Sequence, residues 1–160
     1  MMADQALPEE LRAYAGMHAS FFVLHRAPML LLGRLVESGS EVTVCEWRVG
    51  ETDAFLSPGR GVPAYIGVEY MAQCVAVHAG VRARARNFGP PLGFLLGTRH
   101  YRAAVEYFEL GLTHRVTCRE LVSDDNGMGS YECSILLGDE IVAEGRLAVL
   151  QKEKGQAGSG

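Results

Sequence analysis

The fold is decided by residues 63–86, whose sequence is PAYIGVEYMAQCVAVHAGVRARAR. The segment has no proline after its first residue, and it is rich in alanine and other helix formers. Pro63 suits the first position of a helix, where no backbone donor is needed. The segment therefore predicts one long, buried helix.

Glu69 is the unusual residue of this predicted helix, because it is the only carboxylate between Asp53 and Glu106. The residues that share its face at helical spacing are Ile66, Gln73, Ala76 and Gly80. A carboxylate among apolar neighbours loses solvation, and it can then hold or release a proton near neutral pH. Glu69 is a candidate general acid or base, and the alternative is a purely structural glutamate.

The totals fit one ordinary globular domain. The chain has 160 residues, of which 48% are hydrophobic and 21% charged. Its net charge of −4, without a basic stripe carrying aromatics, argues against nucleic-acid binding through the whole surface. The apolar run at 21–32 contains His25, Arg26 and Pro28, so it predicts neither a membrane span nor a signal-peptide core. We expect a cytoplasmic protein.

The four cysteines are Cys45, Cys74, Cys118 and Cys133, and no two of them have CxxC spacing. This spread predicts reduced, buried thiols and no metal site. Cys74 and His78 lie four residues apart and can form a thiolate pair or half of a metal site. Further ligands at suitable spacing are missing, so we expect core packing.

Strands are predicted on both sides of the helix. The strand-like runs are 29–36, 42–49, 94–102, 112–122, 128–137 and 141–151. Turn residues at 37–40, 124–127 and 138–139 separate neighbouring runs, and 50–62 is a predicted loop. Two strands, one helix and about four more strands indicate an α+β fold with an antiparallel sheet. Its edges need cover, which predicts a dimer with edge-to-edge pairing.

Two stretches resemble a known family. Residues 25–35, HRAPMLLLGRL, and the helix start with Glu69 followed by YMAQ resemble hotdog-fold 3-hydroxyacyl-[acyl carrier protein] dehydratases. Two segments, residues 62–73 and residues 93–99 (GFLLGTR), resemble most the dehydratase-like proteins encoded in bacterial aryl polyene and related polyketide clusters. The resemblance implies a hotdog domain at 21–151, which leaves residues 1–20 as an N-terminal extension. The polar, glycine-rich composition of residues 152–160 predicts a disordered tail.

The resemblance also implies an activity. Members of the family work as homodimers and remove water from a 3-hydroxyacyl thioester carried on the phosphopantetheine of an acyl carrier protein. They give a trans-2-enoyl thioester and need no metal or organic cofactor. By this resemblance Glu69 is the acid or hydroxyl-positioning residue. The backbone amides near Ala64 and Tyr65, at the start of the helix, are expected to polarise the thioester carbonyl through unpaired donors and the helix dipole. Pro63 and Gln73 are the other expected substrate-binding residues.

One departure affects the catalytic base. The family carries its catalytic histidine fourteen residues before the glutamate, where this chain has Phe55. No histidine occurs between His25 and His78, so His25 is the candidate base. Its alternative role is to brace the sheet by hydrogen bonding.

A group of arginines predicts a docking surface for an acidic carrier protein. Its members are Arg82, Arg84, Arg86, Arg99 and Arg102. The alternative is a solvated helix end, where cations favour the helix dipole.

Two other functions stay open. A hotdog thioesterase also uses a helix carboxylate, there to activate water or attack the thioester. A non-catalytic subunit that binds an acyl chain, or forms a hetero-oligomer with a related dehydratase, fits the missing loop histidine.

Overall fold

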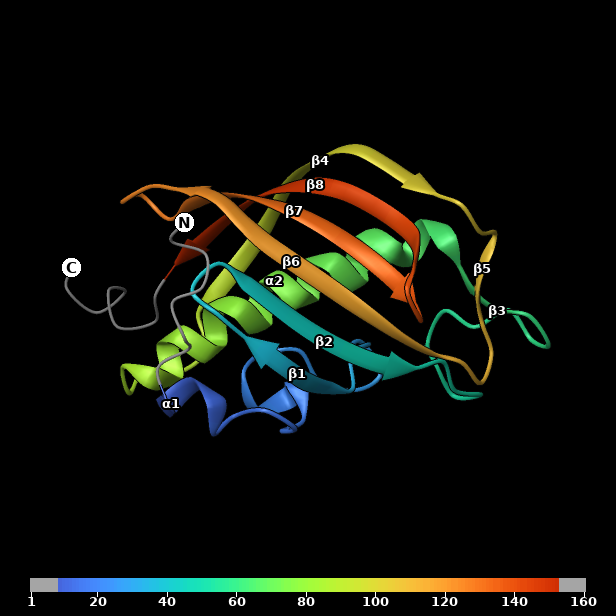
Figure 1. The fold of residues 1–160 in the computed structure, drawn as a ribbon, viewed down its shortest axis with the longest axis horizontal. Coiled ribbons are helices and arrows are strands. Elements are labelled where there is room, and N and C mark those ends of the chain that lie inside the picture. The colour runs from blue at the N-terminus through green and yellow to red at the C-terminus, as the bar shows by residue number, and fades with distance from the viewer. Residues whose placement is uncertain (1–8, 153–160) are drawn as a thin grey trace.

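A six-stranded antiparallel sheet curls around one long helix in the computed structural model, which describes residues 9–152 (Figure 1). The strand order is β1-β2-β6-β7-β8-β4. These strands are β1 Arg34–Ser38, β2 Val42–Arg48, β4 Leu92–Ala103, β6 Thr113–Ser123, β7 Met128–Leu137 and β8 Glu140–Lys152. A second, two-stranded sheet joins β3 Gly61–Pro63 to β5 Tyr107–Glu109. This is the hotdog arrangement that the family resemblance implies.

The central helix is α2 Gly67–Ala85, preceded by the short 3-10 helix η2 Ala64–Ile66. Pro63 does not occupy the first helical position. Its ψ of 140° is extended, and it still belongs to β3, where it pairs with Tyr107 of β5. The remaining helices are α1 Glu9–Arg12 and the 3-10 helix η1 Ala19–Phe21. None of the helices within residues 9–152 is long and apolar enough to cross a membrane.

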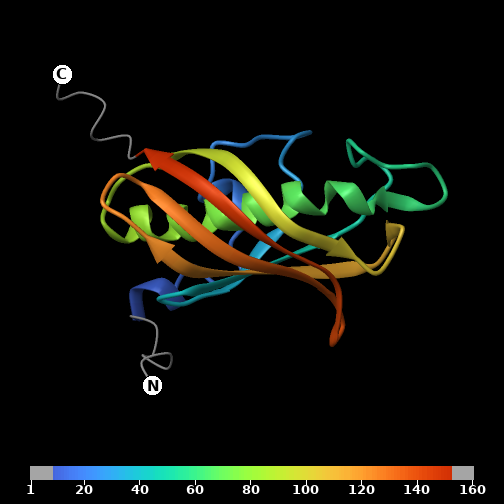
Figure 2. The ribbon, with the colours of Figure 1, turned by 90° about the horizontal axis from the view of Figure 1, so that it is seen from above.

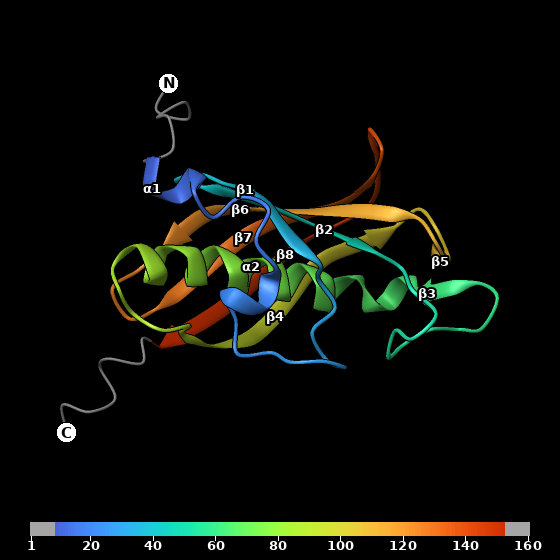
Figure 3. The ribbon, with the colours of Figure 1, turned by 90° about the horizontal axis from the view of Figure 1, so that it is seen from below.

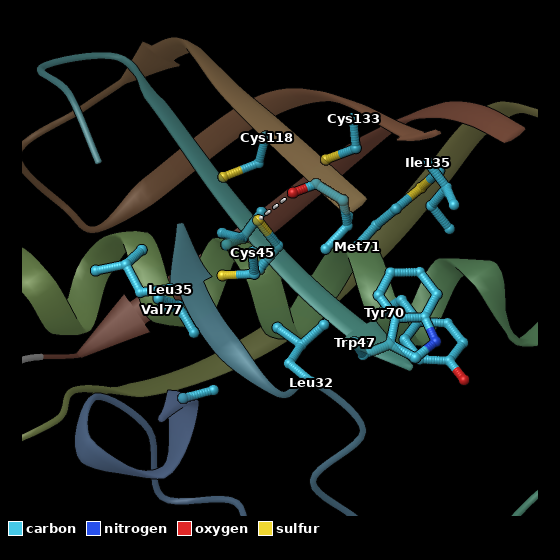
Figure 4. Close-up of a cluster of buried hydrophobic side chains, with 14 of the residues drawn as sticks. Leu32, Leu35, Cys45, Trp47, Tyr70, Met71, Val77, Cys118, Cys133 and Ile135 are labelled. Carbon is cyan, nitrogen blue, oxygen red and sulfur yellow. Dashed lines mark hydrogen bonds between the residues drawn. The ribbon is translucent and has the colours of Figure 1, made fainter. Parts of the chain in front are cut away.

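The core lies between α2 and the concave face of the sheet (Figure 4). Trp47 of β2 stacks on Tyr70 of α2 with ring centroids 4.0 Å apart, and His114 stacks on the same indole at 5.3 Å. All four cysteines are free and buried, which confirms the prediction of buried thiols. The thiol of Cys74 lies within donor distance of the Thr43 carbonyl at 3.5 Å and of the Val116 carbonyl at 3.6 Å, so it packs in the core beside the sheet. No group of three or more metal-ligating side chains occurs within the described part of the chain.

The prediction of a strand over 29–36 is wrong in its first half, because β1 begins at Arg34. Residues 29–31 are held instead by the buried side chain of Gln73, which bonds the Met29 carbonyl and the Leu31 amide. This apolar run forms a loop because the Gln73 side chain, and not a neighbouring strand, supplies the hydrogen-bond partners of its backbone amide and carbonyl groups. The short pair β3 and β5 also has no clear sequence signal.

The segment before β1 packs against the domain from outside the sheet. The Gly16 amide donates to the Leu35 carbonyl at 2.7 Å, and the Leu35 amide returns a bond to the Met17 carbonyl at 2.9 Å. Figure 3 shows this segment continuing across the face of α2 that the sheet leaves open. Residues 1–8 of the predicted N-terminal extension lie outside the described residues. Residues 153–160 of the predicted tail also lie outside them.

The other edge of the sheet, β4, is uncovered in the single chain (Figure 2). Every residue of β4 except Tyr101 is exposed. Its exposed large apolar side chains are those of Leu92, Phe94, Leu95 and Leu96, with exposed fractions of 42–51%. A long apolar edge strand of this kind is a surface for pairing with another sheet.

Candidate active site

Glu69 and His25 line the same pocket, of about 460 Å³, although they are 44 positions apart in the chain. Glu69 comes from the first turn of α2, and His25 from the loop that crosses the helix before β1. Apolar side chains supply most of the other walls. They include Val23, Ala72, Ala76, Phe94 and Leu95. Two proton-exchanging groups in an apolar pocket form a candidate site for acid–base chemistry.

His25 is placed by the fixed backbone around it. The Arg26 guanidinium donates to the Val23 carbonyl at 2.8 Å and to the His25 carbonyl at 2.7 Å. The Nδ1 atom of His25 is buried and has no hydrogen-bond partner among the described residues. Buried polar atoms are nearly always paired, so this nitrogen is an exception among the described residues.

Glu69 is oriented by Gln73, one helical turn away. The Gln73 Nε2 atom donates to Glu69 Oε1 at 3.0 Å and to the Met29 carbonyl at 2.8 Å, while Gln73 Oε1 accepts from the Leu31 amide at 2.8 Å. The Gln73 side chain is fully buried and does not line the pocket, so the structure does not place it at the expected substrate position. It holds the Glu69 carboxylate, and it joins α2 to the loop that follows His25.

Replacing Gln73 with methionine should lower the free energy of unfolding by about 2 kcal/mol, since the Met29 and Leu31 backbone groups lose their partner. Urea unfolding measures this change. Gln151→Met is the matched control, because its side chain is only half-buried and makes no comparable bond; we expect a change within about 0.5 kcal/mol. Equal effects from both variants would contradict the anchoring role of Gln73.

The expected substrate contacts at the start of the helix lie away from this pocket. The Ala64 amide already donates to the Glu106 carbonyl at 2.9 Å, so it is not free to polarise a thioester, and that expectation is wrong. The Ala64 carbonyl accepts from the Tyr101 hydroxyl. Tyr65 is 75% exposed, and neither it nor Pro63 lines the pocket of Glu69. The chain runs directly from β3 into this turn. The Ala64 amide therefore bonds the Glu106 carbonyl next to the β3–β5 pair and is not a free donor at the helix start.

The five arginines predicted to bind a carrier have different surroundings. Arg84 donates to the Phe21 carbonyl from Nε at 3.2 Å and from Nη2 at 3.0 Å, so it holds the N-terminal segment on α2. Arg82 also turns inward, and it donates to the carbonyls of His78 and Gly39. The other three are on the surface: Arg86 lies over the Phe88 ring, Arg99 is exposed, and Arg102 pairs with Glu144 at 3.2 Å.

A buried hydrogen-bond chain connects Arg82 to Glu120 through three neutral side chains. Successive distances are 3.4 Å from Arg82 Nη1 to Ser38 Oγ, 2.7 Å to Thr43 Oγ1, 2.7 Å to His78 Nδ1, and 3.4 Å from His78 Nε2 to Glu120 Oε2. Burial lowers the pKa of His78, so the ring is neutral and carries its proton on Nε2. Guanidinium can only donate and carboxylate can only accept, so every bond runs from Arg82 toward Glu120.

This chain predicts a pH dependence of stability. The hydrogen bond from His78 lowers the pKa of Glu120 from 4.5 to about 2. The bond therefore contributes its full stabilisation above pH 4.5 and loses it as the pH falls toward about 2. We expect Glu120→Gln to flatten the dependence of the urea midpoint on pH in that window, and the exposed control Glu140→Gln to keep it. Identical curves for wild type and Glu120→Gln would contradict this assignment.

Comparison with known proteins identifies the family. The sequence model of the ApeP-like family, described as ApeP dehydratase, matches residues 17–158. The chain belongs to this dehydratase family. Among solved structures, this ApeP-like chain is similar to the dehydratase heterocomplex ApeI:P from Xenorhabdus doucetiae, with 27% identity and a TM-score of 0.81. That match covers 88% of this chain and 95% of the other.

More distant structures share the fold of the ApeP-like chain. Thioesterase superfamily member 2 of zebra fish is 12% identical with a TM-score of 0.55, covering 75% of this chain and 79% of its own. A hypothetical thioesterase of Streptococcus pneumoniae, solved with coenzyme A, is 7% identical with a TM-score of 0.58 over 75% and 85%. None of the curated protein sequences compared with the chain matches it significantly.

Proposed function

We propose that the chain dehydrates 3-hydroxyacyl thioesters carried on the phosphopantetheine of an acyl carrier protein and gives trans-2-enoyl thioesters, in polyene or fatty-acid-like synthesis. The observation that carries this proposal is the pocket shared by His25 and Glu69. Membership of a dehydratase family supports the reaction class. The substrate and its carrier are our inference.

The two side chains divide the chemistry. A ring nitrogen of His25 takes the proton from the carbon next to the thioester carbonyl, and Glu69 gives its proton to the departing hydroxyl. One C–H bond and one C–O bond break, a carbon–carbon double bond forms, and water leaves. The proton on His25 then returns to Glu69, directly or through water, which restores the starting state. All groups in this scheme belong to the protein and the substrate, so we propose that no cofactor takes part.

The free edge β4 supports a second subunit. Pairing with another hotdog chain would cover its exposed apolar side chains. We propose a homodimer or a pair with a related dehydratase, and the similar ApeI:P structure is described as a heterocomplex. Because residues 92–95 line the pocket, the partner would also lie beside the site.

Carrier docking is proposed at the surface arginines Arg86, Arg99 and Arg102, which lie after the end of α2 and along β4. Acidic carriers would be attracted to this side by charge. The four free thiols agree with our proposal of a cytoplasmic protein.

Intact-protein mass spectrometry of a 3-hydroxyacyl carrier protein tests the proposal. Wild-type protein should remove one water from the carrier-bound acyl group, and His25→Ala should slow this by about 10²-fold or more. Glu140→Gln is the control, since Glu140 is exposed at the start of β8 and lines neither the pocket nor β4. Release of free carrier thiol would instead show a thioesterase. No reaction until a related dehydratase is added would show a non-catalytic partner subunit.

A further inference from the structure

The convex face of the sheet, which points away from α2, carries a hollow that the proposed reaction does not use. Its volume is about 460 Å³, and its walls come from β4, β7 and β8. Two arginines, one histidine and two hydroxyl side chains line it, and none of the described residues on its walls is acidic. A hollow with cations and no acid is a candidate site for an anion.

The two arginines of the hollow lie opposite each other on neighbouring strands. Arg99 of β4 and Arg146 of β8 are register partners, so their side chains leave the same face of the sheet. Like charges directly opposite are destabilising. Within residues 9–152, Arg99 forms no ion pair, and Arg146 reaches only Glu132 at 4.0 Å. The nearby Glu144 already pairs with Arg102 at 3.2 Å, so it leaves both charges uncompensated.

A second hollow adjoins the first on the same face, and it shares His100 and Arg146 with it. The two hollows together carry four arginines and two glutamates, on a chain whose net charge is −4. The positive charge is therefore local, and it is concentrated at Arg99 and Arg146, whose hollow contains no acid. An anion bound there would replace the repulsion between two guanidinium groups with charge-assisted hydrogen bonds.

Beside the arginines the convex face becomes apolar. Ala148 and Leu150 follow Arg146 on the same side of β8, because side chains alternate along a strand. Met128 of β7 lies opposite Leu150, and it is 39% exposed. Ser130 lies opposite Ala148, so small side chains form the floor between the charged and the apolar ends. A ligand held by its anionic end at the arginines would find an apolar strip for its other end.

We propose that this hollow binds a small anionic amphiphile, a molecule with one carboxylate or phosphate group at the end of an aliphatic chain. The anionic group lies between Arg99 and Arg146, since guanidinium groups bind both kinds of anion through paired hydrogen bonds. The chain runs over Ala148 toward Leu150, which is about 13 Å from Arg146 along β8. An extended chain of roughly eight carbon atoms spans about 9 Å, so it reaches the apolar strip.

An NMR titration of the isotope-labelled full chain tests this site and locates it. The probes are octanoate and octyl phosphate below the concentrations at which they form micelles. Octan-1-ol and acetate are the matched controls, because the first lacks the charge and the second lacks the chain. Octanoate should shift the amide signals of Gly97, Ser130 and Ala148 in a saturable manner. Each control should bind about tenfold or more weakly than octanoate.

Three arginine variants test the contact with the anionic group. Arg146→Gln and Arg99→Gln should each weaken octanoate binding by about tenfold. Arg99 also belongs to the proposed carrier-docking residues and Arg146 does not, so Arg146→Gln is the cleaner variant. Arg115→Gln is the control, since Arg115 is an exposed arginine of β6 that lines neither hollow, and its octanoate binding should equal that of wild type. Thermal unfolding checks that each variant is folded.

Several outcomes would overturn the site. Amide shifts confined to Ala72 and Ala76 would place octanoate in the pocket of Glu69 instead. Equal binding of octan-1-ol would remove the role of the arginines, and equal binding of acetate would remove the apolar strip.

Sedimentation with vesicles that contain phosphatidylglycerol is the last arm of the test. Binding to vesicles without binding of either octyl probe would replace the small-molecule site with a membrane-binding surface. Tighter binding of octanoate or of octyl phosphate would support the site and identify its preferred anionic group. None of these measurements uses a carrier protein or turnover, so failure here would leave the proposed dehydration standing, and loss of dehydration would leave this site standing.

Discussion

Replacing Glu69 with glutamine should lower the dehydration rate constant by about 10²–10⁴-fold, the usual contribution of a positioned acid or base. The glutamine side chain has the same shape, and its oxygen can still accept the hydrogen bond from Gln73. It has no proton of comparable acidity to give to the leaving hydroxyl. Formation of the enoyl thioester, followed by mass spectrometry under single-turnover conditions, measures the loss.

Two controls show whether this loss is chemical. Glu51→Gln removes an exposed carboxylate from a loop outside the pocket, and its rate should equal that of wild type. The urea midpoint of Glu69→Gln should stay close to the wild-type value, since its contacts are conserved. A Glu69→Gln variant that dehydrates at the wild-type rate would remove Glu69 from the mechanism and leave the pocket without an acid.

Gly80→Ala should destabilise the protein by about 3 kcal/mol and disturb the site from a distance. A Cβ atom at this position would overlap the backbone carbonyl of Phe22, which cannot rotate away. Alanine favours a helix over glycine by about 1 kcal/mol. The steric cost of the overlap exceeds this gain, so the variant is less stable than wild type. The segment that carries His25 must move outward, so catalysis should fall together with stability.

Gly50→Ala is the matched control, because an added Cβ would meet only the Asp53 side chain at 3.7 Å, an ordinary contact. Its free energy of unfolding should change by less than about 0.5 kcal/mol. Urea unfolding and the dehydration rate are measured for both variants. A stable, fully active Gly80→Ala protein would show that the segment can shift without moving His25, against the close packing described here.

The sequence predicts the architecture well because the fold follows from periodicity. The helix at 67–85, both hairpin turns after 112 and the positions of the six strands along the chain all have local signals. The pairing of His25 with Glu69 in one pocket agrees with the choice of these two as candidates. Their roles in catalysis remain predictions.

What the sequence misses depends on contacts between distant residues. No sequence pattern near residues 29–31 shows that Gln73 bonds their backbone. The apolar run at 29–36 is therefore predicted as a strand from its first residue. The use of the Ala64 amide by Glu106 follows from the short β3–β5 pairing, which has no pattern of its own. Arg82 and Arg84 are read as surface charges because helical spacing does not show which way a long side chain turns.

The buried cysteines give the protein a built-in reporter of opening. Burial raises the pKa of Cys74 and Cys118 well above the usual range, so neither is a thiolate at neutral pH. A thiol reagent can react with them only after the sheet and α2 separate. The rate of alkylation in native buffer therefore measures how often the core opens, and a ligand in the pocket of Glu69 and His25 should slow that labelling.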